Sequence, residues 1–132
     1  MRTLLVLSFI LLSSPAVVFA GAKVEVVVDD KAPQLEQRAA DEVAALLKRL
    51  YQAEVTKLAT PSGSQPTIFI GSPATNPALA FAKADWPKLS DQGHLVKSAK
   101  HRDQPALLIG GGSPVATYWA ACEYAHHLGV RT

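Results

Sequence analysis

The fold is decided by the stretch PALLIGGGSPVATYWAACEYAHHLG, Pro105 to Gly129, in which a strand, a turn and a helix follow one another. The apolar run at its start is bounded by turn residues, which predicts an interior strand over 105–109. Three glycines follow, and Ser113-Pro114 then combines a side chain that caps a helix with a proline suited to its first turn. The apolar stripe of this helix is expected at Tyr118, Ala121, Cys122, Ala125 and Leu128. The stretch therefore predicts a strand joined by a tight turn to a long helix, which ends at Gly129.

A second long helix is expected nearer the start of the chain. Pro33 suits a first helical turn, and apolar residues recur after it at spacings of three and four. These apolar residues are Leu35, Ala39, Val43, Leu46, Leu47 and Leu50. Polar and charged residues fall mainly on the opposite side, at Gln37, Arg38, Asp41, Lys48 and Arg49. The pattern predicts an amphipathic helix with one apolar face.

Short β-branched or apolar runs predict four further strands, at 23–28, 54–58, 67–70 and 94–98. The segment 77–84 is expected to form a short helix, and 60–66 and 100–104 are polar turn segments. The elements follow in the order strand, helix, strand, strand, short helix, strand, strand, helix. This order predicts an α+β fold, in which a small mixed β-sheet has two long amphipathic helices packed on one face.

The first twenty residues have the pattern of a signal peptide. Arg2 supplies a positive charge, Leu4 to Leu12 form an apolar core too short to span a bilayer, and Val18-Phe19-Ala20 presents small residues for cleavage. We therefore predict cleavage after Ala20 and a secreted or periplasmic location; a buried strand or an uncleaved anchor is the alternative. Residues 21–132 are then long enough for one domain with its own core.

The composition favours a globular protein, with 48% hydrophobic and 18% charged residues. The formal net charge is +2 and the basic residues are scattered. Neither nucleic acid nor, once the signal peptide is removed, a membrane is therefore predicted as a partner. Cys122 is the only cysteine of the chain, so an internal disulfide is excluded.

The glycine-rich turn is a candidate anion-binding site. Gly111, Gly112 and Ser113 precede a helix, and the N–H groups and dipole of a helix N-terminus favour an anion. The dinucleotide-binding fingerprint lacks its third glycine here, and the Lys-Ser/Thr pair of a phosphate-binding loop is missing. The favoured interpretation of the glycines is a tight connection that lets strand and helix pack closely.

Other reactive residues do not form a recognisable set. Glu123, His126 and His127 lie within one turn of each other, but metal sites of this kind need ligands from other helices, so a solvated helix end is favoured. The remaining carboxylates are dispersed, and no pair suited to glycoside hydrolysis stands out. The sequence therefore predicts no catalytic residue, no metal and no cofactor.

Aromatic residues suggest one further candidate. Trp86 lies in a predicted loop, and we single it out for contact with a carbohydrate ring. Tyr118 and Trp119 belong to the last helix, where at least one of them is expected in the core.

Segments of the chain resemble a known family. They are the helix Leu35–Leu47 (LEQRAADEVAALL), the strand end Ile68–Gly71, and the closing stretch Leu107–Tyr124 with Leu128–Arg131. These segments are similar to the N-terminal domain of family 67 α-glucuronidases, and similar domains occur in bacterial β-hexosaminidases. The resemblance covers nearly all of residues 21–132. It implies an accessory domain that precedes a (β/α)₈ barrel carrying the catalytic carboxylates, so no catalytic residue is transferred to this chain.

The leading hypothesis is a non-catalytic accessory domain of a secreted glycoside hydrolase, with the catalytic barrel as its partner in cis or in trans. The chain ends at Thr132, where the resemblance places the linker to a barrel. A fragment of a longer enzyme and a separate small protein both remain open. The alternative is a stand-alone periplasmic module that binds carbohydrate or protein, and a third hypothesis is a small anion-binding enzyme that uses Gly110 to Ser113.

Overall fold

The computed structural model describes residues 22–82 and 84–129, so the predicted signal peptide and its cleavage site after Ala20 lie outside the described residues. The bounds of the elements are β1 Lys23–Val27, α3 Gln34–Tyr51, β2 Glu54–Leu58, β3 Thr67–Ile70, η1 Pro77–Phe81, β4 His94–His101, β5 Gln104–Gly111 and α4 Pro114–His127. This is the order that the sequence predicts.

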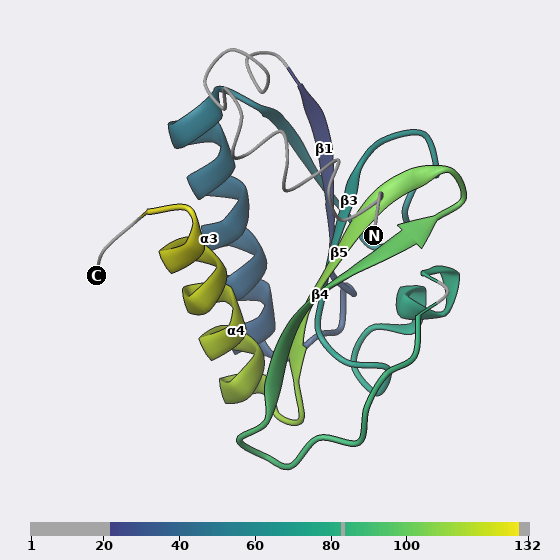
Figure 1. The fold of residues 1–132 in the computed structure, drawn as a ribbon, viewed down its shortest axis with the longest axis vertical. Coiled ribbons are helices and arrows are strands. Elements are labelled where there is room, and N and C mark those ends of the chain that lie inside the picture. Colours follow the sequence, from purple (N-terminus) through teal and green to yellow (C-terminus); the bar gives the residue numbers. More distant parts are fainter. Residues whose placement is uncertain (1–21, 83, 130–132) are drawn as a thin grey trace.

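The strands form a mixed five-stranded sheet in the described chain, with the order β2-β1-β3-β5-β4. β1 pairs in parallel with β2 and β3, β3 pairs in parallel with β5, and β4 is antiparallel to β5. The helices α3 and α4 lie side by side over one face of the sheet, and η1 lies on the other side (Figure 1). The predicted α+β fold with two long helices on one face is confirmed.

The core is divided by the alternation of side chains along the strands. Val26, Ile68 and Ile109 face the two helices, and together with α3 and α4 they form the larger apolar cluster. Their neighbours Val27, Phe69 and Leu108 face the opposite side, where Ala78, Leu79 and Ala82 cover them. Both faces of the central strands are therefore buried, which explains why these strands are continuously apolar in sequence.

Helix α3 follows its predicted pattern except at its two ends, where Leu35 and Leu50 are only half-buried. Ala39, Val43, Leu46 and Leu47 are buried as predicted. The polar and charged residues predicted on the opposite side are exposed or half-buried. Glu36, beside Leu35, is buried instead. The helix ends where Gln52 adopts a left-handed conformation with φ 53° and donates its N–H to the last turn.

The buried face of α4 differs from the predicted stripe. It consists of Ala116, Thr117, Ala120, Ala121 and Tyr124. The other predicted residues are only half-buried, namely Tyr118, Cys122, Ala125 and Leu128. The reason is that α4 packs on two neighbours, the sheet and α3 (Figure 1). Small residues let it approach the sheet, and Tyr118 contacts Glu42 of α3.

Two segments are shaped differently from their prediction. The short helix is a 3₁₀-helix that ends at Phe81 rather than at residue 84. The predicted turn over 100–104 narrows to Arg102 and Asp103, because the pairing of β4 with β5 continues to His101 and Gln104. Arg102 takes the left-handed conformation, with φ 56°, that this tight reversal requires.

Candidate functional site

The carboxyl ends of the parallel strands form the edge of the sheet at which a ligand site is expected. In open sheets of parallel strands, ligands bind in the crevice beyond these ends, next to the starts of the following helices. Both α3 and α4 begin at this end of the sheet (Figure 1). The glycine-rich turn lies here as well, with Gly110 and Gly111 as the last residues of β5, and Gly112 and Ser113 joining it to α4.

The three glycines of this turn are required for close packing. A Cβ atom on Gly110 would clash with the carbonyl oxygen of Gly71 and lie 2.6 Å from the Trp86 ring. A Cβ on Gly111 would lie 2.6 Å from the Cβ of Ala116, and one on Gly112 would clash with the backbone of the loop before β4. Larger residues would therefore separate β5 from its neighbours, which supports the packing interpretation of the glycines.

Several polar groups of the same turn already have partners within the chain. The N–H of Gly112 donates to the carbonyl of Gly93 at 2.9 Å. The hydroxyl of Ser113 donates to the carbonyl of Asp91 at 2.5 Å and accepts from the N–H of Ala116 at 3.1 Å. An anion at Gly111, Gly112 and Ser113 would have to displace these bonds, and the anion site stays a prediction.

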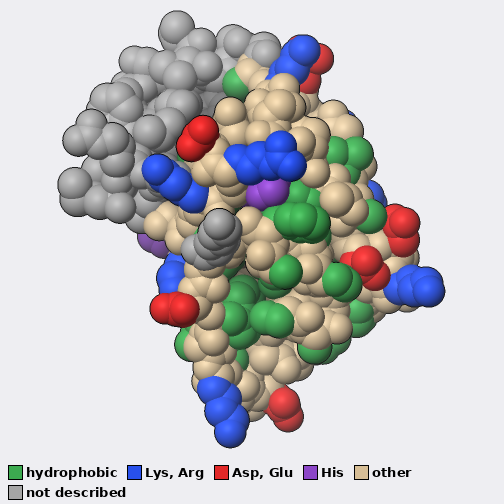
Figure 2. Space-filling view, turned by 90° about the vertical axis from the view of Figure 1, so that its right-hand side faces the viewer, with side chains coloured by type: hydrophobic (Ala, Val, Ile, Leu, Met, Phe, Trp, Pro, Cys, Tyr) green, Lys and Arg blue, Asp and Glu red, His purple; other side chains and the backbone are tan. Residues whose placement is uncertain are grey.

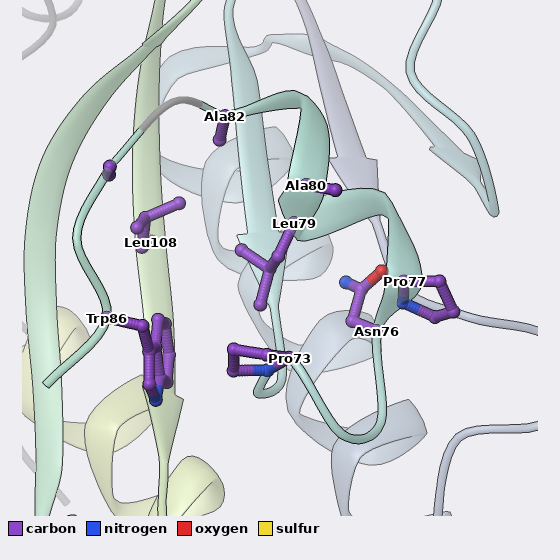
Figure 3. Close-up of a pocket in the computed structure, with 9 residues that line it drawn as sticks. Pro73, Asn76, Pro77, Leu79, Ala80, Ala82, Trp86 and Leu108 are labelled. Carbon is purple, nitrogen blue, oxygen red and sulfur yellow. The ribbon is translucent and has the colours of Figure 1, made fainter. Parts of the chain in front are cut away.

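A pocket of about 240 Å³ opens on the face of the sheet opposite to the helices. Figure 2 shows that hydrophobic side chains gather on this face. Figure 3 shows Trp86 and Leu108 on one side of the pocket, Leu79 and Pro73 next to each other in the middle, and Pro77 on the far side. The structure thus places the sequence-predicted Trp86 in the wall of a cavity.

The side chain of Asn76, in the wall of this pocket, is hydrogen-bonded within the chain. Asn76 is fully buried, and its side-chain nitrogen donates to the carbonyls of Val27 at 3.1 Å and Ile70 at 2.8 Å. Its side-chain oxygen accepts from the N–H of Ala78 at 3.2 Å, and this bond caps the start of η1. The pocket therefore offers an apolar wall suited to the flat side of a ring, with few groups for its hydroxyls. Carbohydrate contact by Trp86 stays a prediction.

The histidines and Glu123 at the end of α4 do not assemble into a metal site. Glu123 accepts from His94 of β4 at 2.9 Å, across the helix–sheet boundary. His126 and His127 are exposed. No group of three or more potential ligands from His, Cys, Asp and Glu occurs in the described part of the chain.

The outer side of α4 exposes large apolar side chains. Val115 and Trp119, which are one helical turn apart, are 43% and 45% exposed. Tyr118 is half-buried, and its hydroxyl donates to Glu42 of α3 at 2.7 Å. Tyr118 packs against the core from its edge and Trp119 is exposed, so neither is fully buried in the core. We call Val115 and Trp119 the outer face of α4.

Sequence reasoning did not single out Glu36, which is the most buried carboxyl group of the described chain at 1% exposure. It lies on the first turn of α3, close to Gly71, Thr75 and Thr117. Burial raises the pKa of Glu36, and the hydroxyls of Thr75 and Thr117 partly offset this rise. The signal in the sequence was the helical spacing, because Glu36 is three residues before Ala39 and seven before Val43.

Comparisons with known proteins give a likeness of fold. No family of known proteins and no curated protein matches the sequence. Among solved structures, the fold is similar to part of a family GH115 4-O-methyl-α-glucuronidase with specificity for decorated arabinogalactans. The TM-score is 0.69 at 15% sequence identity, and the match covers 85% of this chain and 14% of that chain. At this identity the likeness shows the fold alone.

This match corrects the resemblance that the sequence suggested. The similar structure belongs to family GH115 and not to family 67, so the narrower resemblance is not supported. What holds is the coarser statement that this fold forms a small part of a glycoside hydrolase. Within residues 22–82 and 84–129, no helix is both long enough and apolar enough to cross a bilayer.

Proposed function

We propose that this chain is a non-catalytic accessory domain that packs against the catalytic domain of a secreted glycoside hydrolase, in cis or in trans. The observation that carries the proposal is that its fold matches 14% of the length of a glucuronidase, while the match covers 85% of this chain. A small fold that recurs inside a much longer enzyme is suited to a role beside a catalytic domain. Export directed by residues 1–20 would bring the domain to extracellular polysaccharides.

The outer face of α4 is the surface that we propose for this contact. A helix that is apolar on its outer side as well as its inner side is typical of a helix covered on both sides. Tryptophan is enriched at the centres of protein interfaces, where its large side chain is removed from water. Because the similar fold is embedded in a longer enzyme, the occupant that we propose is the catalytic domain of the glycoside hydrolase.

The non-catalytic part of the proposal is tested with the purified chain and chromogenic glucuronides and hexosaminides. We expect no turnover above the buffer control, because the residues that line the pocket include no carboxylate. Turnover that copurifies with the chain through two chromatographic steps would contradict the proposal.

The docking surface is tested with Trp119→Ser and the matched variant Phe81→Ser. Phe81 is 51% exposed and lies on η1, on the opposite side of the sheet, so it controls for the loss of an exposed aromatic ring. The partner is the catalytic domain encoded beyond the codon for Thr132 or in an adjacent gene. We expect Trp119→Ser to weaken complex formation in size-exclusion chromatography at least tenfold, and Phe81→Ser to leave it unchanged.

Equal binding by the two variants would place the interface elsewhere on the domain. A concentration-dependent dimer of the chain alone that Trp119→Ser abolishes would assign the outer face of α4 to a second copy. If no catalytic domain is encoded in frame or nearby, the accessory role itself is wrong.

The pocket supports a second candidate function, a module that binds carbohydrate through Trp86. The indole ring lines an apolar cavity, and aromatic walls are suited to stacking on sugar rings. The test is a titration with arabinogalactan oligosaccharides, followed by tryptophan fluorescence. Binding through this pocket requires a saturable change that is present in Trp119→Ser and absent from Trp86→Ala. An unchanged signal in Trp86→Ala would exclude the pocket.

A further inference from the structure

Glu36 lies at the point where three parts of the fold meet. Its own helix, α3, follows β1, while Gly71 and Thr75 belong to the segment after β3, and Thr117 belongs to the first turn of α4 after β5. A Cβ atom on Gly71 would lie 3.1 Å from Oε1 of Glu36, so the glycine leaves room for the carboxyl group. The side chain of Glu36 thus fills the junction beyond the carboxyl ends of three parallel strands.

The surroundings of Glu36 provide few hydrogen-bond donors. An ionised carboxylate has about four positions that accept hydrogen bonds, and burying it without donors is costly. The hydroxyls of Thr75 and Thr117 lie close enough to Glu36 to lower its pKa. Within the described residues, however, neither Oε1 of Glu36 nor the fully buried Oγ1 of Thr117 has a partner that meets the geometry of a hydrogen bond. The junction therefore suits an uncharged carboxylic acid better than a carboxylate.

Glu25 is a second buried carboxyl group, and unlike Glu36 it has hydrogen-bond donors for both oxygens. It is 5% exposed, and one oxygen accepts from the N–H of Ser62 at 2.9 Å while the other accepts from the Ser62 hydroxyl. Both oxygens of Glu25 thus have partners, whereas Oε1 of Glu36 has none. Glu36 thus combines burial with an oxygen that lacks a donor.

Charged groups near Glu36 do not compensate for the missing donors. The groups that face it from the segment after β3 and from α4 are Thr75 and Thr117, which are uncharged. On the turn before α3, the carboxylate of Asp29 accepts from the N–H of Lys31 at 3.0 Å. The N-terminal dipole of α3 favours the charged form of Glu36, but burial is the larger influence and raises its pKa.

We propose that Glu36 is a proton-binding site of the folded domain, held as an uncharged acid at the junction of α3, α4 and the segment after β3, and that loss of this proton loosens the junction. The inference does not depend on the proposed function. It makes the fold sensitive to pH at one buried atom. Acidic surroundings stabilise the junction, and alkaline surroundings draw water toward it.

The sign of the effect follows from linkage. The folded-state pKa of Glu36 is raised above its unfolded value, so the stabilisation is fully present below the unfolded pKa and is lost as the pH rises through the folded pKa. Each unit between the two pKa values corresponds to about a tenfold change in the ratio of folded to unfolded protein.

The direct test is a carbon NMR titration of the glutamate carboxyl groups in the full chain. The signal of Glu36 is identified by its absence from Glu36→Gln, and Glu54→Gln, which changes an exposed residue of β2, identifies a reference signal. We expect Glu36 to titrate at higher pH than Glu54. We expect Thr117→Val to shift the Glu36 titration further upward, because it removes a hydroxyl that lowers the pKa.

Urea unfolding as a function of pH gives an independent readout. We expect the wild type to lose stability relative to Glu36→Gln as the pH rises through the Glu36 titration, while Glu54→Gln follows the wild type. If Glu36→Gln does not fold, the titration in Thr117→Val decides, with the Glu36 signal assigned by through-bond correlation. A Glu36 signal that titrates with or below that of Glu54 would overturn the proposal.

Discussion

The two long helices cover the same face of the sheet, but they pack in different ways. Helix α3 turns large aliphatic side chains inward, such as Val43 and Leu47, and keeps charged residues outside. Helix α4 turns alanines inward, such as Ala116 and Ala120, and exposes Trp119. The outer side of α3 is thus charged, whereas α4 carries apolar side chains on its outer side as well as on its inner side.

Polar and aromatic side chains connect the two helices at the surface of the molecule. Glu42 of α3 accepts from Arg38 at 3.0 Å and from the hydroxyl of Tyr118 at 2.7 Å, and the Arg38 guanidinium lies 5.6 Å from the centre of the Tyr118 ring. The hydrogen bond to Glu42 is the main cause that raises the pKa of Tyr118. Because water screens such exposed pairs, they contribute little to stability and serve mainly to orient α4 against α3, while the inner faces of the helices provide most of the stability.

The largest loss of stability is expected when a large side chain is removed from the inner face of α3. Leu47 is 1% exposed, so Leu47→Ala deletes buried methyl groups and leaves a cavity. We expect the free energy of unfolding to fall by about 2–5 kcal/mol. The measurement is urea denaturation followed by far-UV circular dichroism at a pH well below the Glu36 titration.

Leu50→Ala is the matched control, since it makes the same chemical change in the same helix at a half-buried position. We expect its effect to be clearly smaller than that of Leu47→Ala, because less of the side chain leaves an apolar environment. Equal effects would mean that the inner face of α3 is not the main source of stability.

Much of the fold could be predicted because local patterns and tertiary packing agree. The strands Glu54–Leu58 and Thr67–Ile70 lie where the β-branched and apolar runs predict them. The apolar stripe of α3 is flanked by charges, so its buried face was visible in the sequence. The buried face of α4 was not, because this helix has apolar residues on most of its sides and periodicity alone cannot choose between them.

The candidate sites were harder to predict because they depend on distant parts of the chain. Trp86 was visible as an isolated aromatic residue in a loop, but the prolines and Leu108 that complete its pocket come from other segments. The helical spacing of Glu36 was a weak signal, because the residue stands in a charged stretch, LEQRAADE. The arrangement of Gly71, Thr75 and Thr117 around it shows that this acid is buried. Sequence spacing does not show which glutamate a distant glycine admits.

A smaller loss of stability is expected on the inner face of α4. There, enlarging a small side chain should destabilise the protein, whereas on α3 the destabilising change is the removal of a large one. Ala120 is fully buried against the sheet, so Ala120→Leu adds methylene groups where α4 approaches the strands closely. We expect a loss of about 1–3 kcal/mol, from side chains forced out of preferred rotamers and a shift of the helix. Val115→Leu enlarges an exposed residue of the same helix, and we expect its effect to be within about 0.5 kcal/mol. Unfolding curves of the two variants decide the point: if Ala120→Leu is as stable as Val115→Leu, α4 does not depend on small residues to lie close to the sheet, and its inner and outer faces differ less than the structure indicates.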